Sequence, residues 1–262
     1  MASRARTQTA LVSCYDAIDE LCGTLTETQW QVASLCPDWD VTGVLTHVAG
    51  IESVLDGWFP ASADDPLPFD RLGVFLAEVD GMSGSELLDR YRAIVARRRD
   101  QLEALTDDQW QAPSPTPVGP GTYGRFMEIR VFDCWVHEQD IRVPLGLTGH
   151  TTGLAAEISI DEIAGSLGYL VGKKVGLPDG TSIAFHLTGP IERDLYAVVE
   201  GRARAVDHLD DPDVAVRTDS FTFALLACGR IDPQGAIDAG TITWTGDDTL
   251  GDRAARNLAF TF

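Results

Sequence analysis

The sequence is poor in positive charge and contains almost no lysine. Its 262 residues carry 20 Lys and Arg against 40 Asp and Glu, which gives a formal net charge of −20 at pH 7. Lys173 and Lys174 are the only lysines, and no cluster of basic residues alternates with aromatic residues. Because such an acidic chain repels polyphosphate and anionic lipid, we expect neither nucleic acid nor a membrane among its partners.

Cysteine is also scarce, and long apolar runs are absent. The five cysteines are odd in number, widely spaced and form no Cys-x-x-Cys pair, which argues against a disulfide framework and a thiolate zinc cage. We expect them to be small core residues in a reducing compartment. No segment has the length of a membrane span, and the first residues lack the apolar stretch of a signal peptide, so the expected location is cytoplasmic.

Common catalytic signatures are missing as well. The sequence has no glycine-rich phosphate loop, no Gly-x-Ser-x-Gly and no His-Glu-x-x-His. His137 and Glu138 are followed by Gln139 and Asp140, so the zinc-protease pattern is not completed.

A short phrase occurs twice in the first half of the chain. LTETQW at residues 25–30 returns as LTDDQW at 105–110, and each copy follows a segment whose apolar residues recur at helical spacing. In each copy a Thr and a Gln have capping-box spacing. A second helix follows each phrase, one from Asp40 to about Phe59 and one containing RVFDCWVHEQDIR. Two helix pairs predict a four-helix bundle over residues 1–150.

The character of the chain changes after residue 150. Val143-Pro144 and the following Gly146, Gly149 and Gly153 indicate a linker. Helical segments are then expected at 154–174, 220–228 and 248–258, and alternating strands at 181–187, 195–201, 213–218 and 240–246. Helices and strands that do not alternate strictly predict an α+β domain over residues 151–262, and the whole chain is expected to be α+β.

The helix containing RVFDCWVHEQDIR carries the strongest functional signal. Asp133 and His137 lie four residues apart and therefore share one helical face. His47, on the helix that occupies the equivalent place in the other pair, is the candidate third ligand. Two histidines and one carboxylate leave a coordination position open, as in catalytic zinc sites, although non-haem iron uses the same set.

Arg130 and Asp140 share the face of Asp133 and His137. Beside a metal they would orient the ligands or face the substrate, and we predict both as catalytic residues. The alternative is an internal network that satisfies itself, Arg130 with Asp133 and His137 with Asp140. His150, His186 and His208 have no such neighbours in the sequence and are expected at ordinary core or surface positions.

These segments resemble a known family. SLCPDWDVTGVLTHVAGIE and RVFDCWVHEQDIR are similar to the N-terminal domain of the mycothiol-dependent maleylpyruvate isomerase family, a DinB-like metal-binding four-helix bundle. TDSFTFALLACGRIDPQGAIDAGTITWTGD, residues 218–247, is similar to the sterol-carrier-protein-like C-terminal domain of that family. The resemblance implies a divalent metal, zinc being expected, on His47, Asp133 and His137, with the low-molecular-weight thiol mycothiol as cosubstrate.

The resemblance further implies an enzyme that isomerises or S-conjugates a small electrophile, working as a monomer or homodimer. The isomerase has Glu at the position of Asp133, and the shorter carboxylate could change the substrate, so the fold is expected to transfer better than the named reaction. The alternative function is a non-catalytic binding protein for a small apolar ligand, with a vestigial metal site.

Overall fold

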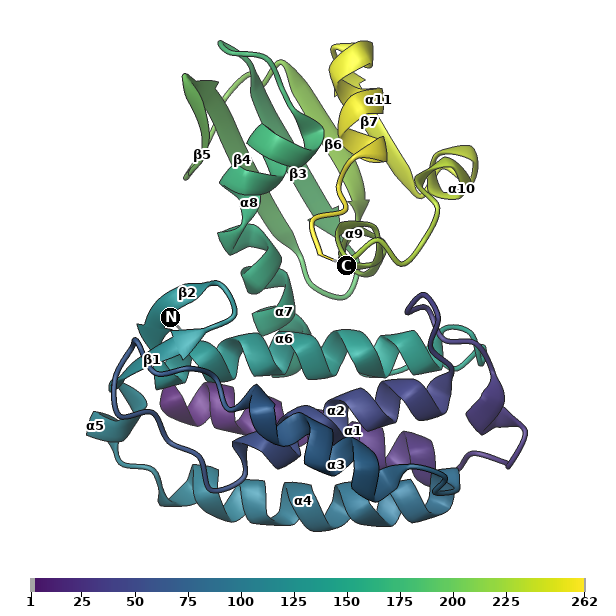
Figure 1. The fold of residues 1–262 in the computed structure, drawn as a ribbon. Helices are drawn as coiled ribbons and strands as arrows, with labels where there is room; N and C mark the ends of the chain where they lie inside the picture. Colours follow the sequence, from purple (N-terminus) through teal and green to yellow (C-terminus); the bar gives the residue numbers. More distant parts are fainter. Residues whose placement is uncertain (1–2, 262) are drawn as a thin grey trace. The chain divides into compact units, whose positions relative to one another are not determined.

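The computed structural model describes residues 3–261 and divides into two compact units, one ending at Ile158 and the other beginning at Ser159. The first unit is mainly helical, whereas the second contains a five-stranded sheet with helices (Figure 1). This combination confirms the α+β class. Helix α7 (Leu154–Gly165) crosses the division, and the boundary proposed after residue 150 lies shortly before it.

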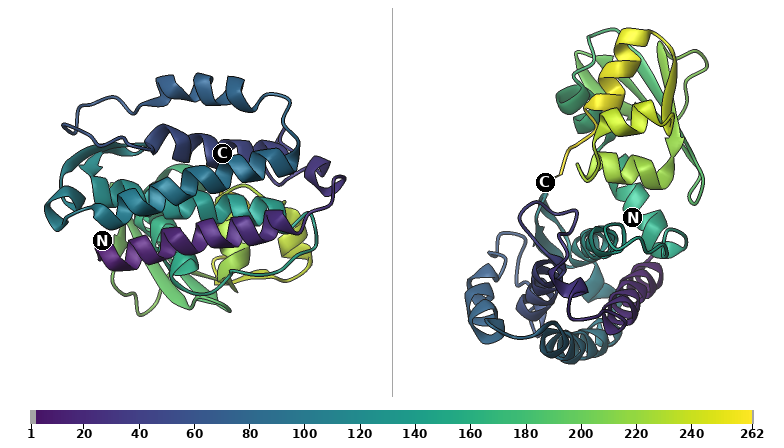
Figure 2. Two further views of the ribbon diagram at one scale, coloured as in Figure 1. Left: turned by 90° about the horizontal axis from the view of Figure 1, so that it is seen from below. Right: turned by 90° about the vertical axis from the view of Figure 1, so that its right-hand side faces the viewer.

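Four long helices build the core of the first unit. They are α1 (Arg4–Gly23), α2 (Val41–Leu55), α4 (Gly84–Ala104) and α6 (Tyr123–Arg142). Both α1 and α2 pack against α4 and α6. Figure 2 shows these helices end-on around a common core, with α3 (Leu72–Val79) outside them and beside α2. The smaller elements are η1 (Gln29–Gln31), η2 (Phe69–Arg71), α5 (Asp107–Trp110), β1 (Pro113–Thr116) and β2 (Gly119–Thr122).

The repeated Thr-x-x-Gln-Trp phrase makes the same Gln-to-Thr hydrogen bond at both places, in a 3-10 turn at the first and an α-helical turn at the second. The Gln29 side-chain oxygen accepts the Thr26 backbone N–H at 2.9 Å, and Gln109 accepts that of Thr106 at the same distance. Thr106 completes a capping box by accepting the Gln109 N–H. These bonds satisfy N–H groups that a helix start leaves without partners, which confirms the predicted turns.

The tryptophan that ends each phrase lies against a glycine in the first turn of a long helix. Trp30 covers Gly84 of α4, and Trp110 covers Gly124 of α6. A Cβ atom at either glycine would overlap the indole ring. Each repeated phrase therefore packs its tryptophan against the start of one long helix, while the caps of these helices come from Ser83 and Thr122.

The sheet of the second unit has the strand order β5-β4-β3-β6-β7. Its strands are β3 (Ser182–Thr188), β4 (Arg193–Glu200), β5 (Arg202–Val206), β6 (Val214–Asp219) and β7 (Ile242–Gly246). Strands β3 and β6 are parallel, and all other neighbours are antiparallel. The strand β5 was not expected, because its sequence, RARAV, places charge at alternate positions on an exposed edge.

Helices cover this sheet on the face seen in Figure 1. They are α8 (Leu167–Tyr169), the π-helix η3 (Leu170–Val175), α9 (Ser220–Ala227), α10 (Pro233–Asp238) and α11 (Asp248–Arg256). The single helix expected over 154–174 was wrong, since α7 ends at Gly165 and the chain continues as a short turn and a π-helix. Across residues 3–261 no helix combines the length and apolar character that crossing a bilayer requires.

Candidate metal centre

The structure brings His47, Asp133 and His137 together inside the first unit. His47 comes from α2, and the other two come from adjacent turns of α6. The His47 Nε2 lies 3.6 Å from Asp133 Oδ2, and the His137 Nε2 lies 3.7 Å from Asp133 Oδ1. One donor atom of each residue lies within 4.8 Å of the others, a spacing compatible with a single metal ion.

Local sequence explains why α2 presents His47 to this place. The Asp40 carboxylate accepts the Gly43 N–H at 2.8 Å and starts the helix two turns before the histidine. The apolar residues Val44, Val48 and Ile51 on the same helix are buried and hold it against the bundle. The position of His47 is thus set by a capped, buried helix.

One nitrogen of the cluster, the Nε2 of His47, has no hydrogen-bond partner among the described residues. The His47 Nε2 is buried, and none of the residues 3–261 offers it a hydrogen bond. A buried polar nitrogen without a partner is costly, and an imidazole lone pair is a good ligand for a divalent metal. The donor set of two imidazoles and one carboxylate therefore fits a metal ion.

His137 is oriented by a second carboxylate. Its Nδ1 lies 2.8 Å from Asp140 Oδ2, and Asp140 is fully buried. Because an ionised carboxylate only accepts, we assign the ring proton to Nδ1, which leaves the Nε2 lone pair directed to the cluster. The Cys36 thiol donates to the same Asp140 oxygen at 3.0 Å. Cys36 was expected to be an ordinary core residue, and only its place shortly before Asp40 could have marked it.

Asp133 is held by the buried guanidinium of Arg130. The NH1 of Arg130 donates to Asp133 Oδ2 at 2.5 Å, while its Nε donates to Glu52 Oε1 at 3.0 Å. The internal network that the sequence offered as the alternative to a metal site is therefore present. Arg130 pairs with Asp133, and His137 pairs with Asp140. They leave the Nε2 atoms of both histidines free to face the carboxylate, so the network and a metal site are compatible.

Glu52 extends this network away from the cluster. Its Oε2 accepts from Arg98 Nε at 2.9 Å and from the Tyr15 hydroxyl at 2.6 Å, and both Glu52 and Arg98 are fully buried. The sequence analysis missed both residues. Each nevertheless continues an apolar helical stripe, Glu52 four residues after Val48 and Arg98 four residues after Ile94, which is the signal that could have revealed them.

Neighbouring positive charges keep the carboxylates of Asp133 and Glu52 ionised. Burial raises the pKa of Asp133, but the neighbouring Arg130 guanidinium, together with the two histidines, outweighs burial and holds the pKa of this carboxyl well below its usual range. Burial likewise raises the pKa of Glu52, and Arg130 and Arg98 lower it further than burial raises it. Two guanidiniums, Arg98 and Arg130, therefore balance the charges of Asp133 and Glu52.

An aromatic side chain borders the cluster. The Trp39 ring centroid lies 5.2 Å from that of His47 and 6.1 Å from that of His137, and Trp39 is 38% exposed. Gly43 gives this ring room, since a Cβ there would lie 3.2 Å from the Trp39 Cβ. Asp38, just before the tryptophan, has a left-handed backbone with φ 66°. The cluster thus has a half-exposed apolar wall.

The remaining histidines lie outside this cluster. His150 Nδ1 is 2.6 Å from Glu138, His186 is 2.7 Å from Asp194 and His208 is 3.1 Å from Asp210. Each is paired with one carboxylate. Within the described part of the chain two groups have metal-ligand geometry, His47 with Asp133 and His137, and Cys36 with His137 and Asp140. Neither group includes any of these three histidines.

Comparison with known proteins gives the same two-part organisation. Residues 11–142 match the family described as mycothiol maleylpyruvate isomerase N-terminal domain, and residues 157–253 match the MDMPI C-terminal domain. A crystal structure of the mycothiol-dependent maleylpyruvate isomerase superposes with a TM-score of 0.60, and that of its histidine-to-alanine mutant with 0.65. Each is 15% identical and covers 93% of both chains, so the likeness shows the fold. No curated protein matches the sequence. The two domain matches confirm the resemblance, and the chain belongs to the mycothiol maleylpyruvate isomerase family.

Proposed function

We propose that this protein is a metal-dependent enzyme that uses a low-molecular-weight thiol, mycothiol, to isomerise or S-conjugate a small electrophile. The observation that carries the proposal is the convergence of His47 Nε2, His137 Nε2 and the Asp133 carboxylate, with the buried His47 nitrogen lacking a hydrogen bond within residues 3–261. His47, Asp133 and His137 would hold the metal, with zinc as the first candidate. When bound, the metal lowers the pKa of a thiol and supplies the reactive thiolate at neutral pH.

The surrounding residues prepare this site. Asp140 holds the proton of His137 on Nδ1, and Arg130 fixes one oxygen of Asp133. We therefore assign Arg130 and Asp140 roles in positioning the ligands, because the donors of Arg130 are directed to Glu52, Asp133 and the Cys134 sulfur. The role that we propose for Arg130 and Asp140 is therefore narrower than the catalytic role predicted from the sequence. Their hydrogen-bond partners support an action on the ligands Asp133 and His137.

Trp39 would form the apolar side of the reaction space. Its half-exposed ring beside the two histidines would exclude water from one side of a bound metal and would offer a flat surface to an unsaturated substrate. The resemblance places Asp133 where the isomerase has Glu, and the shorter side chain would bring a bound metal closer to α6. We infer that the reaction type is shared more closely than the substrate.

Metal analysis of the purified protein tests the first part of the proposal. We expect about one divalent ion per chain, and its loss in His47→Ala and His137→Ala. His186→Ala, which removes a histidine paired with Asp194 in the other unit, is the matched control and should retain the metal. Absence of metal binding by the wild-type protein would disprove the proposed centre.

The second part is tested with mycothiol and a panel of small electrophiles. Mass spectrometry follows conjugation, and proton NMR follows double-bond geometry, because isomerisation leaves the mass unchanged. We expect turnover that requires both thiol and metal. Turnover that persists without the thiol would contradict the proposed cosubstrate.

A further inference from the structure

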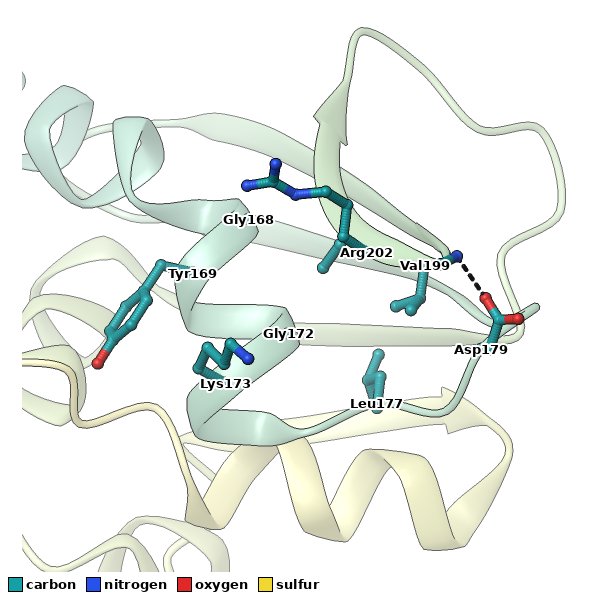
Figure 3. Close-up of a pocket in the computed structure, with 10 residues that line it drawn as sticks. Gly168, Tyr169, Gly172, Lys173, Leu177, Asp179, Val199 and Arg202 are labelled. Atoms are coloured by element: carbon teal, nitrogen blue, oxygen red, sulfur yellow. Dashed lines mark hydrogen bonds between the residues drawn. The ribbon is translucent and has the colours of Figure 1, made fainter.

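The second unit contains a cavity of about 420 Å³ between the helical segment α8–η3 and strands β4 and β5 (Figure 3). Leu177, Val199 and Ala203 supply apolar surface, and Lys173 and Arg202 supply positive charge. The volume lies in the range of roughly 300–1,000 Å³ that is usual for small-molecule sites. The cavity is therefore large enough for a compact organic ligand.

The two cations that line this cavity are not used elsewhere. Among residues 3–261 neither the Lys173 amine nor the Arg202 guanidinium has a hydrogen-bond or ion-pair partner. Lys173 is one of only two lysines in a chain of net charge −20. Figure 3 shows Arg202 extending from β5 towards the Gly168 end of the helix, and Lys173 extending from the helix towards the strand side. Both side chains are exposed to solvent, and at one cavity of an acidic protein they are free to contact an anionic ligand.

Asp179 is the single carboxylate among the lining residues. It accepts the Gly201 backbone N–H at 2.6 Å, which turns it towards the loop between β4 and β5. One lysine and one arginine against one aspartate leave one unit of positive charge. The charge balance thus favours a monoanion over a dianion such as a phosphate monoester.

The backbone around the cavity departs from regular structure. Residues Leu170–Val175 form a π-helix, a conformation that occurs mostly as short segments and often at functional sites. Gly168 and Gly172 let this segment approach β5 closely, since a Cβ at Gly172 would lie 2.9 Å from the Ala203 Cβ. The widened helical turn presents Lys173 to the cavity directly after this close contact.

We propose that this cavity binds a small amphipathic monoanion, a carboxylate with a short apolar body. The carboxylate contacts the Lys173 amine and the Arg202 guanidinium, which can donate two parallel hydrogen bonds. The apolar body lies on Leu177 and Val199. This site goes beyond the function proposed above, because none of its residues belongs to the metal centre.

Calorimetric titration of the full-length protein with hexanoate, hexyl phosphate and hexanol tests the site. We expect saturable binding of hexanoate, weaker binding of hexyl phosphate and none of hexanol. Lys173→Gln and Arg202→Gln should each weaken hexanoate binding about tenfold, the effect of losing one charge-assisted hydrogen bond. Arg204→Gln is the matched control, because Arg204 lies on the same strand, pairs with Glu200 and does not line the cavity.

A parallel titration of His137→Ala distinguishes binding at this cavity from binding at the metal centre. This variant should bind hexanoate with the affinity of the wild-type protein. Loss of binding in His137→Ala would place the carboxylate at the metal centre and overturn the proposal. So would tighter binding of hexyl phosphate, no saturation at millimolar hexanoate, or wild-type affinity in both charge variants. Failure to find a metal leaves these titrations fully informative.

Discussion

Glu52→Gln removes the charge that lies between two buried guanidiniums. In the wild-type protein Arg98 and Arg130 both donate to the Glu52 carboxylate, and the side chains of Glu52 and Arg98 are 0% exposed. Glutamine preserves the size of the side chain but has only one accepting atom, and its amide N–H groups face a cation. Breaking a buried ion pair by removing one partner costs about 3–5 kcal/mol, and we expect the free energy of unfolding to fall by this amount.

Urea unfolding followed by tryptophan fluorescence measures this loss in the correct part of the chain, because every tryptophan except Trp244 lies in the first unit. Glu78→Gln is the control. Glu78 is exposed and pairs with Arg90 on the surface, so its replacement should cost less than about 1 kcal/mol.

The metal provides a second readout of the same substitution. Without the Glu52 charge, the Arg130 side chain is less well fixed in position, and so is the Asp133 carboxylate to which it donates. The affinity for the metal should therefore fall by about tenfold. If Glu52→Gln loses no more stability than Glu78→Gln, the buried network does not support the bundle and this reasoning is refuted.

The other predictions concern the ligand shell, the glycine contacts and the thiols. Asp140→Asn should weaken metal binding by about 10–100-fold in a competition titration, whereas Asp194→Asn should not change it. Gly84→Ala should destabilise the protein by about 1–3 kcal/mol, because the new Cβ overlaps Trp30, while Gly73→Ala on α3 has open space and should be neutral or stabilising in the same urea experiment. All five cysteines are buried, and burial raises the pKa of Cys22 to about 12. A disulfide reagent at pH 8 should therefore label almost no thiol in the native protein and five after unfolding, and rapid native labelling would contradict the described packing.

Patterns within single elements were enough to predict the main helices and most strands. The long helices form where apolar residues recur at helical spacing, and α2 begins after Asp40 as expected. The hairpin β1–β2 was missed because its Pro/Gly-rich sequence has no alternation, although backbone pairing from Pro113 to Thr122 is well defined. The break after Gly165 was missed because it depends on close contact with β5, and contacts across a fold leave no local signal.

For the candidate site, the sequence predicted the three candidate ligands and missed the buried contacts that surround them. The spacing of Asp133 and His137 on one helix, and the place of His47 on the equivalent helix of the other pair, indicated residues that the structure places together. The sequence could not show that Arg130 reaches Glu52, because that contact joins α6 to α2 over a separation set by bundle packing. A close approach of side chains from different helices is decided by the tertiary structure.

The position of Trp39 means that its fluorescence should respond to a metal ion bound between His47 and His137. An indole with its ring centroid 5.2 Å from one candidate ligand and 6.1 Å from another lies within quenching distance of any open-shell ion held between them. Titration with Co²⁺ or Cu²⁺ would then lower the tryptophan emission, and Trp39→Phe would reduce that change while leaving the ligands intact. Occupancy of the centre could be followed in real time, without a label and before any substrate is known.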